Sequence, residues 1–342
     1  MFFEQENEMK KKILFIYTNY STFVKTDVDI LSSENEVIKY QYKPVKGLLK
    51  TALQFLKQLI YLVFNIWKFD AAFIWFADYH SFLPVLFAKI TGKKSFVVIG
   101  GYDVANIPEY KYGSLSSPLR KMLTLFTFKY ATCCFPVVEE LENKIKQVCP
   151  KAKTKTIYTG YKFEGEKNTV FAQEREKIVL TVSVTENRQR VFIKGLDRFR
   201  ELAEKLPDYT FYLIGANENA RHLFETVPAN LKLLPPMNQA GLKDYYIKAS
   251  FYAQFSRSEG LPNALCEGML YGCIPLGTKV GGIPAAIGNL GLLMDEWDVK
   301  TAAEYVKNYQ NKANREAFSW RIKEKFDLNF RIEKLLNEIN QK

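Results

Sequence analysis

Short apolar runs alternate along this chain with longer stretches in which apolar residues recur every three or four positions. The longer stretches predict amphipathic helices, and the short runs predict strands. The expected strands are Ile13–Thr18, Ala71–Phe76, Ser95–Ile99, Thr132–Phe135, Ile178–Val184, Thr210–Ile214, Leu231–Leu234, Phe251–Phe255 and Ile274–Gly277. Strand, helix and strand in repetition are typical of parallel sheets covered by helices. These strands are too many for one compact sheet. We therefore expect an α/β fold with two doubly wound, Rossmann-like domains that face each other across a cleft.

The pattern is weakest near the middle of the chain, where Thr159–Tyr161 and a charged stretch up to Lys177 predict an inter-domain connection. We expect an N-terminal domain over 1–160 and a C-terminal domain over 161–313. The segment 314–342 is amphipathic and helical, with no strand of its own to cover, so it is expected to cross back onto the first domain. Ligands of such sheets bind beyond the carboxyl ends of the strands, and the loops that follow strands therefore matter most.

The segment Lys46–Lys68 has apolar residues at helical spacing and lysines on or near its other face. One interpretation is a helix that covers the sheet and turns its lysines to solvent. The other is a basic amphipathic helix that lies on an anionic bilayer surface. Tyr61 and Phe64 widen the apolar face beyond what packing needs, which favours the second interpretation without deciding it.

The composition, 47% hydrophobic and 25% charged residues, excludes a disordered chain. No window approaches the roughly 18–20 apolar residues of a membrane span, and the acidic start does not predict a secretory signal. The five cysteines form no C-x-x-C pair and there are two histidines, which argues against a disulfide framework or a zinc site. We expect a cytoplasmic protein.

The net charge of +11 is concentrated in the first half of the chain. Residues 1–158 hold 22 basic and 14 acidic residues, whereas residues 159–342 hold 26 and 23. A basic amino half indicates an anionic partner: phosphates, a lipid surface or nucleic acid. No stacking or groove-reading motif accompanies the charge, so we do not expect nucleic acid to be the partner.

Ser256–Leu293 is the segment that carries most chemical information, because it follows a predicted strand. Gly260–Pro262 predicts a turn, and a helical pattern begins at Asn263. A turn that leads into a helix presents backbone N–H groups and the positive end of the helix dipole, which together bind phosphate. Glu259 and Glu267 flank this turn with seven residues between them, and each carboxylate can accept hydrogen bonds from two hydroxyls of a sugar.

The order of these elements resembles the donor-site signature of family 4-type retaining glycosyltransferases, which have the GT-B fold. The resemblance is carried by the elements Glu259–Pro262, Glu267, Tyr271–Pro275, Val280–Pro284, Lys194–Asp197 and Leu213–Gly215, and less specifically by Thr22–Val24, Asp29–Leu31 and Ile99–Asp103.

The resemblance implies roles for the matching residues. Glu259 would contact the transferred sugar, and Glu267 would hold the ribose hydroxyls of a nucleotide-diphosphate sugar. Lys194, with Arg188 or Arg190, would neutralise the diphosphate leaving group, and both arginines fit the expected spacing. Backbone positions would contact the rest of the donor, at Gly260, Leu261, Pro262, Asn263 and Gly215. No metal and no resident cofactor is expected, because these groups can stabilise the developing charge.

Three positions depart from the family pattern. Thr18–Ser21 replaces a glycine pair after the first strand, and Ala285 stands where a glutamate usually ends the second Gly-Gly element. Asp103 lies near the place of an absent acceptor-loop histidine and is the expected substitute, with a catalytic and acceptor-binding role. Gly101 precedes it. His80, expected at the mouth of a loop before Ser81 as a helix cap, is a further acceptor-binding candidate.

The sequence thus predicts a glycosyltransferase that uses a nucleotide sugar and a glycan or lipid-linked acceptor, in polysaccharide or lipopolysaccharide assembly. It would be cytoplasmic, with a peripheral position on the inner face of the cell membrane. Two alternatives stay open: the same fold acting on a soluble acceptor, and a non-catalytic GT-B subunit that scaffolds a partner.

Overall fold

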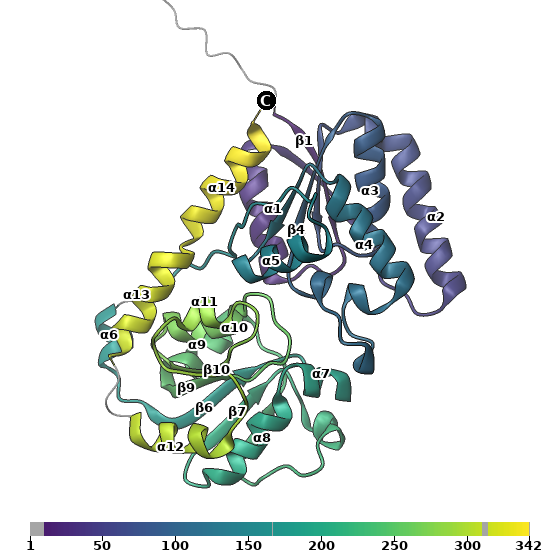
Figure 1. Ribbon diagram of the computed structural model, residues 1–342. Coiled ribbons are helices and arrows are strands. Elements are labelled where there is room, and N and C mark those ends of the chain that lie inside the picture. Colours follow the sequence, from purple (N-terminus) through teal and green to yellow (C-terminus); the bar gives the residue numbers. More distant parts are fainter. Residues whose placement is uncertain (1–9, 166, 310–313, 342) are drawn as a thin grey trace, which may run out of the picture. The chain divides into compact units, whose positions relative to one another are not determined.

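The computed structural model describes residues 10–165, 167–309 and 314–341, which form two compact units (Figure 1). The first unit comprises the described residues up to Ile157 and those from Arg331 onward, and the second comprises Tyr158–Phe330. Within this part of the chain, no helix is long and apolar enough to cross a membrane.

The first unit is built on a five-stranded parallel sheet in the order β2-β1-β3-β4-β5. Its strands are β1 Lys12–Tyr17, β2 Glu36–Gln41, β3 Ala71–Trp75, β4 Lys94–Ile99 and β5 Cys133–Pro136. Its main helices are α1 Thr22–Glu34, α2 Leu48–Asn65, α3 Tyr79–Ile90, α4 Pro118–Tyr130 and α5 Glu139–Val148. Short 3-10 turns follow α2 and β4, at Ile66–Lys68, Tyr102–Val104, Pro108–Tyr110 and Ser114–Ser116. The central strand β3 is buried along its whole length, which explains its uninterrupted apolar sequence.

The second unit is built on a six-stranded parallel sheet in the order β11-β10-β9-β6-β7-β8. Its strands are β6 Glu176–Val182, β7 Thr210–Ile214, β8 Leu231–Leu234, β9 Ala249–Gln254, β10 Ile274–Thr278 and β11 Leu292–Met294. The helices before β9 are α6 Lys167–Ala172, α7 Arg188–Ile193, α8 Leu196–Lys205, the 3-10 helix Glu218–Leu223 and α9 Gln239–Lys248. Those after it are α10 Asn263–Leu270, α11 Ile283–Ile287, α12 Val299–Tyr309 and α13 Arg315–Phe326.

All nine predicted strands are present with ends within two residues of the prediction, but β2 and β11 were not predicted. Strand β2 lies at a sheet edge and has no buried residue, so it shows no apolar run. Strand β11 is only three residues long. The tail is helical as predicted, although Asp327 separates α13 from α14 Leu328–Asn340.

Candidate active site

The segment with the most chemical information leaves the second sheet at the carboxyl end of β9. This strand is fully buried and lies between β10 and β6, so the loop that follows it starts from a rigid base. The chain then turns through Gly260–Pro262, and α10 begins at Asn263 with Pro262 as its N-cap residue. Because proline cannot cap with a side chain, the first backbone N–H groups of α10 stay available to an acceptor.

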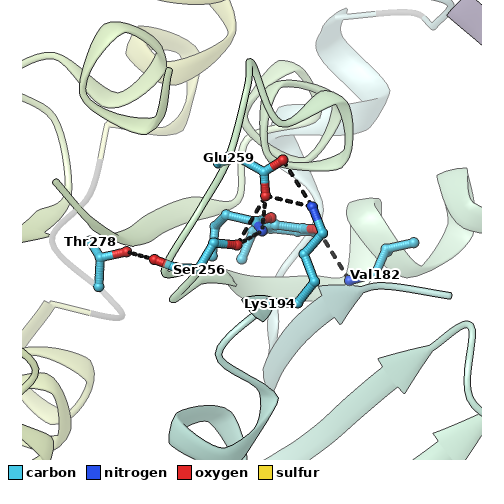
Figure 2. A network of polar contacts seen from close by, with 7 residues as sticks. Val182, Lys194, Ser256, Glu259 and Thr278 are labelled. Carbon is cyan, nitrogen blue, oxygen red and sulfur yellow. Dashed lines mark hydrogen bonds and ion pairs between the residues drawn. The ribbon is translucent and has the colours of Figure 1, made fainter. Parts of the chain in front are cut away.

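A charged network occupies the start of this turn (Figure 2). The ammonium of Lys194 donates to both carboxylate oxygens of Glu259, at 2.9 and 2.7 Å. The same carboxylate accepts hydrogen bonds from Ser256 Oγ at 2.9 Å and from Gln254 Nε2 at 3.2 Å. Thr278 Oγ1 donates to the Ser256 carbonyl oxygen at 2.7 Å, which ties the loop to β10. The arrangement holds a fixed carboxylate and a fixed cation side by side, with part of each exposed.

Two glycines allow the backbones around this network to approach closely. Gly195 has φ +64°, and a Cβ there would overlap the carbonyl oxygen of Phe255. Gly281 has φ +58°, and a Cβ there would overlap the carbonyl oxygen of Glu259. The next residue, Gly282, donates its backbone N–H to the Gly260 carbonyl oxygen at 2.6 Å. The Lys-Gly and Gly-Gly elements therefore fix the position of Lys194 and the shape of the turn.

Glu267 lies one turn into α10 and is half-buried. Its carboxylate accepts hydrogen bonds from Tyr246 at 3.1 Å and from Gln239 at 3.4 Å. Burial raises the pKa of Glu267, and these two donors oppose the rise. The Tyr252 hydroxyl accepts the Val182 N–H at 3.1 Å, and burial together with the charges of Glu267 and Glu259 raises the pKa of Tyr252. One tyrosine is thus electrostatically coupled to both predicted carboxylates.

The remaining donor-site candidates also lie on elements of the second unit. Gly260, Leu261 and Pro262 are buried, and the Asn263 side chain accepts a hydrogen bond from Tyr161 at 2.6 Å. Arg188 and Arg190 lie in the first turn of α7, the former exposed and the latter half-buried. Gly215 follows β7 and has φ +106°.

The predicted acceptor residues lie in the first unit, at the carboxyl ends of β3 and β4. The carboxylate of Asp103 is fully buried and accepts the backbone N–H groups of Ala77, Gly100 (2.8 Å) and Gly101 (3.1 Å). Burial raises the pKa of Asp103 to about 7, although these N–H groups act to lower it. The arrangement links the loops after the two strands.

The predicted placement of His80 at a loop mouth was wrong. It lies in the first turn of α3, is 3% exposed, and one ring nitrogen hydrogen-bonds the Trp75 carbonyl oxygen at 2.7 Å. Ser81 does not cap the helix, because α3 begins at Tyr79 and its N-cap residue is Asp78. The helix begins before Ser81 because packing stabilises it: residues such as Leu83, Val85 and Ala88 bury one face of α3.

Sequence reasoning missed several polar partners of the two glutamates. Gln254 and Ser256 contact Glu259, whereas Tyr246 and Gln239 contact Glu267. A signal existed for Gln254, because it is a polar residue between the apolar Ala253 and Phe255 at the end of a buried strand. Tyr246 and Gln239 come from α9, and no local pattern indicates that they reach α10. Among the described residues, no group of three or more His, Cys, Asp or Glu side chains is placed to hold a metal ion.

Residues 176–311, which contain this network, match the family model described as Glycosyl transferases group 1. The sequence likeness to group 1 glycosyltransferases thus lies in the second unit. The predicted family resemblance is thereby confirmed for the segment that holds Lys194, Glu259 and Glu267. No curated protein matches the sequence of the chain at a significant level.

Solved structures show a likeness of fold over nearly the whole chain. A sucrose-phosphate synthase from Thermosynechococcus elongatus is similar with a TM-score of 0.76 and 13% identity, over 97% of this chain and 99% of that one. Anabaena HepE in complex with UDP and glucose is similar with a TM-score of 0.71 and 14% identity, over 97% of this chain and 100% of that one. A trehalose-6-phosphate synthase studied for glycosyl transfer with retention is similar with a TM-score of 0.66 and 12% identity, over 96% of this chain and 99% of that one. These likenesses confirm the α/β fold of the GT-B type.

Proposed function

We propose that this chain is a retaining glycosyltransferase that moves a sugar from a nucleotide-diphosphate sugar to an acceptor hydroxyl. The observation that carries the proposal is the Lys194–Glu259 pair at the turn before α10, inside the segment that matches the family. The structurally similar HepE, in complex with UDP and glucose, supports the donor class. The similar trehalose-6-phosphate synthase, studied for transfer with retention, supports the stereochemistry.

In this proposal the donor diphosphate lies against the backbone N–H groups at the start of α10. Breaking the sugar–phosphate bond builds negative charge on the diphosphate, and Lys194 with Arg188 or Arg190 stabilises that charge. Glu259 accepts hydrogen bonds from the transferred sugar, and Glu267 from the ribose. No residue serves as nucleophile, and no resident metal or cofactor is required.

The acceptor hydroxyl would attack from the face that the diphosphate leaves. The bond between the acceptor oxygen and the anomeric carbon forms as the sugar–phosphate bond breaks, and an oxygen of the departing diphosphate takes the hydroxyl proton. The configuration at the anomeric carbon is thereby retained.

We propose a lipid-linked or cell-surface polysaccharide intermediate as the acceptor, and a cytoplasmic location peripheral to the inner face of the cell membrane. The basic charge of residues 1–158 supports an anionic acceptor or surface. Gly101, Asp103 and His80 would act by shaping the loops that receive the acceptor, because the side chains of Asp103 and His80 are buried.

A nucleotide panel tests this proposal. Thermal unfolding is measured with UDP, GDP and ADP, and one of them should stabilise the protein by about 2.7 kcal/mol at 100 times its dissociation constant. Hydrolysis of the matching sugar donor should be lost in Glu259→Gln and kept in Glu324→Gln, an exposed glutamate on α13. NMR of the product with an accepted acceptor then gives the anomeric configuration. If no nucleotide stabilises the chain, the result favours the non-catalytic scaffold alternative and contradicts the proposed transferase.

A further inference from the structure

Helix α2 and the 3-10 turn Ile66–Lys68 that follows it expose a stripe of large apolar side chains. Of the nineteen large apolar side chains that the described residues expose, eight lie between Leu48 and Trp67, and Leu48, Phe64 and Trp67 are 85%, 71% and 69% exposed. Seven of the eight lie on α2, and Trp67 lies on the 3-10 turn that follows it. We call all eight the outer face of α2: Leu48, Leu49, Leu53, Leu56, Ile60, Val63, Phe64 and Trp67. Apolar surface concentrated in this way marks an interaction site on a soluble protein.

The opposite face of α2 already supplies the packing that the helix needs. Leu62 is buried, and Gln58, also buried, donates a hydrogen bond to the His80 carbonyl oxygen at 2.8 Å. The Tyr61 ring packs on Tyr40 with centroids 4.6 Å apart. The outer face repeats with alternating steps of four and three residues, from Leu49 to Trp67, so it forms a second stripe on the far side of the helix. The fold of the first unit therefore does not account for it.

The charge around the outer face indicates what covers it. Between Val37 and Phe69 the sequence has six lysines and no acidic residue. Lys50, Lys57 and Lys68 lie beside the outer face at helical spacing, where their stems can follow the apolar surface while the ammonium groups reach outward. A second copy of this chain seated on the same face would bring lysines against lysines. An anionic lipid surface offers both acyl chains for the stripe and phosphates for the lysines.

We propose that the outer face of α2 docks the protein on an anionic lipid bilayer, with the helix axis in the plane of the interface. The apolar stripe enters the boundary between headgroups and acyl chains, and the lysines contact lipid phosphates. Docking brings the first unit, the proposed acceptor unit, to the lipid surface. The choice of a lipid-linked acceptor rests on the proposed function, whereas docking itself can be measured without donor or acceptor.

Sedimentation of the full chain with vesicles tests the charge part of this proposal. Vesicles of equal parts phosphatidylcholine and phosphatidylglycerol should bind the protein at low salt, and binding should weaken at high salt or with phosphatidylcholine alone. The variant Lys50→Gln/Lys57→Gln/Lys68→Gln should lower the affinity at least about tenfold, since each lysine near an anionic surface adds roughly fivefold. The matched control Lys205→Gln/Lys232→Gln/Lys307→Gln removes the same charge from the second unit and should stay within about twofold of wild type.

A second variant tests the apolar part. Leu53→Ser/Ile60→Ser/Phe64→Ser keeps every lysine and should also lower vesicle binding at least about tenfold. The control Trp320→Ser/Phe330→Ser removes exposed apolar side chains of the second unit and should bind like wild type. The tryptophan emission of wild type should shift to shorter wavelength on vesicles, and Trp67→Phe should remove most of that shift. Unchanged circular dichroism and thermal unfolding verify that each variant is folded.

Three results would overturn the proposal. They are no vesicle binding by wild type at low salt, wild-type binding by the serine variant, and a concentration-dependent dimer that the serine variant abolishes. The last result would mean that a second copy covers the outer face. Stabilisation by the nucleotide found in the panel is measured in parallel for every variant and should not change. Failure of nucleotide binding with intact vesicle binding would reject the transferase and leave the docking surface in place.

Discussion

Lys194 and Glu259 form their ion pair across 65 positions of sequence, from the end of α7 and the turn before α10. Glu259 does not depend on Lys194 alone, because Ser256 and Gln254 also donate to its carboxylate. Lys194, in contrast, has the Glu259 carboxylate as the acceptor of both hydrogen bonds described for its ammonium. A donor diphosphate would therefore compete with Glu259 for this cation.

Lys194→Ala should lower the transfer rate by about 10²–10³, because a preorganised cation at the developing charge is lost. Lys205→Ala is the matched control, since this lysine lies in the last turn of α8, at the opposite end of that helix from Gly195. Steady-state rates with the donor found in the nucleotide panel give the comparison. Equal rates in the two variants would remove Lys194 from the proposed leaving-group site.

At the scale of elements, Asp103 joins the loops after β3 and β4 through backbone N–H groups of Ala77, Gly100 and Gly101. Its raised pKa of about 7 makes this link sensitive to pH. The carboxyl has an ordinary pKa near 3.8, so between these two values the folded chain holds a proton that the unfolded chain releases. The free energy of unfolding therefore falls as pH rises through this window.

We predict that Asp103 makes the free energy of unfolding depend on pH. Relative to Asp103→Asn, the free energy of unfolding of wild type should decrease from about pH 4 to about pH 7, by up to about 1.4 kcal/mol per pH unit. Denaturant titrations at several pH values measure the difference, in which other titrating groups cancel. Asp29→Asn, an exposed aspartate on α1, should show no such slope. A flat difference for Asp103→Asn would mean that the carboxyl stays ionised in the fold.

The elements also show which parts of the fold and of the candidate site can be predicted from the sequence. Buried parallel strands such as β3 are visible as apolar runs, whereas the exposed edge strand β2 is not. Glu259 and Lys194 could be found because each belongs to a local motif with glycine beside it. Their hydrogen-bond partners, and the burial of Asp103 and His80, depend on which elements pack together. Spacing along the chain does not contain that information.

At the scale of the whole molecule, the two ends of the described chain meet in the first unit. Arg331 of α14 donates from Nε and Nη2 to the two oxygens of Asp27 on α1, both at 2.6 Å. These side chains are 2% and 0% exposed, and Trp75 Nε1 donates to the same carboxylate at 2.8 Å. A buried charge that loses its partner is strongly destabilising, even where the intact pair adds little.

Arg331→Ala should therefore destabilise the first unit by about 3–5 kcal/mol. Lys155→Ala is its control, because Lys155 pairs with Glu338 of the same helix at the surface and should contribute under about 1 kcal/mol. Hydrogen exchange of α1 amides reports the first unit separately from the second, where two-state analysis of the whole chain would not apply. Unchanged exchange in Arg331→Ala would show that water or another donor compensates Asp27.

The separation of Asp27 from Arg331 by 304 positions has a consequence during synthesis. At 5–20 residues per second, roughly 15–60 s pass between the synthesis of Asp27 and that of Arg331. The segment Tyr158–Phe330 contains every residue of the second unit, so the folding of that unit does not require Arg331. A released chain that ends at Phe330 should then carry a native-like second unit next to an unfinished first unit.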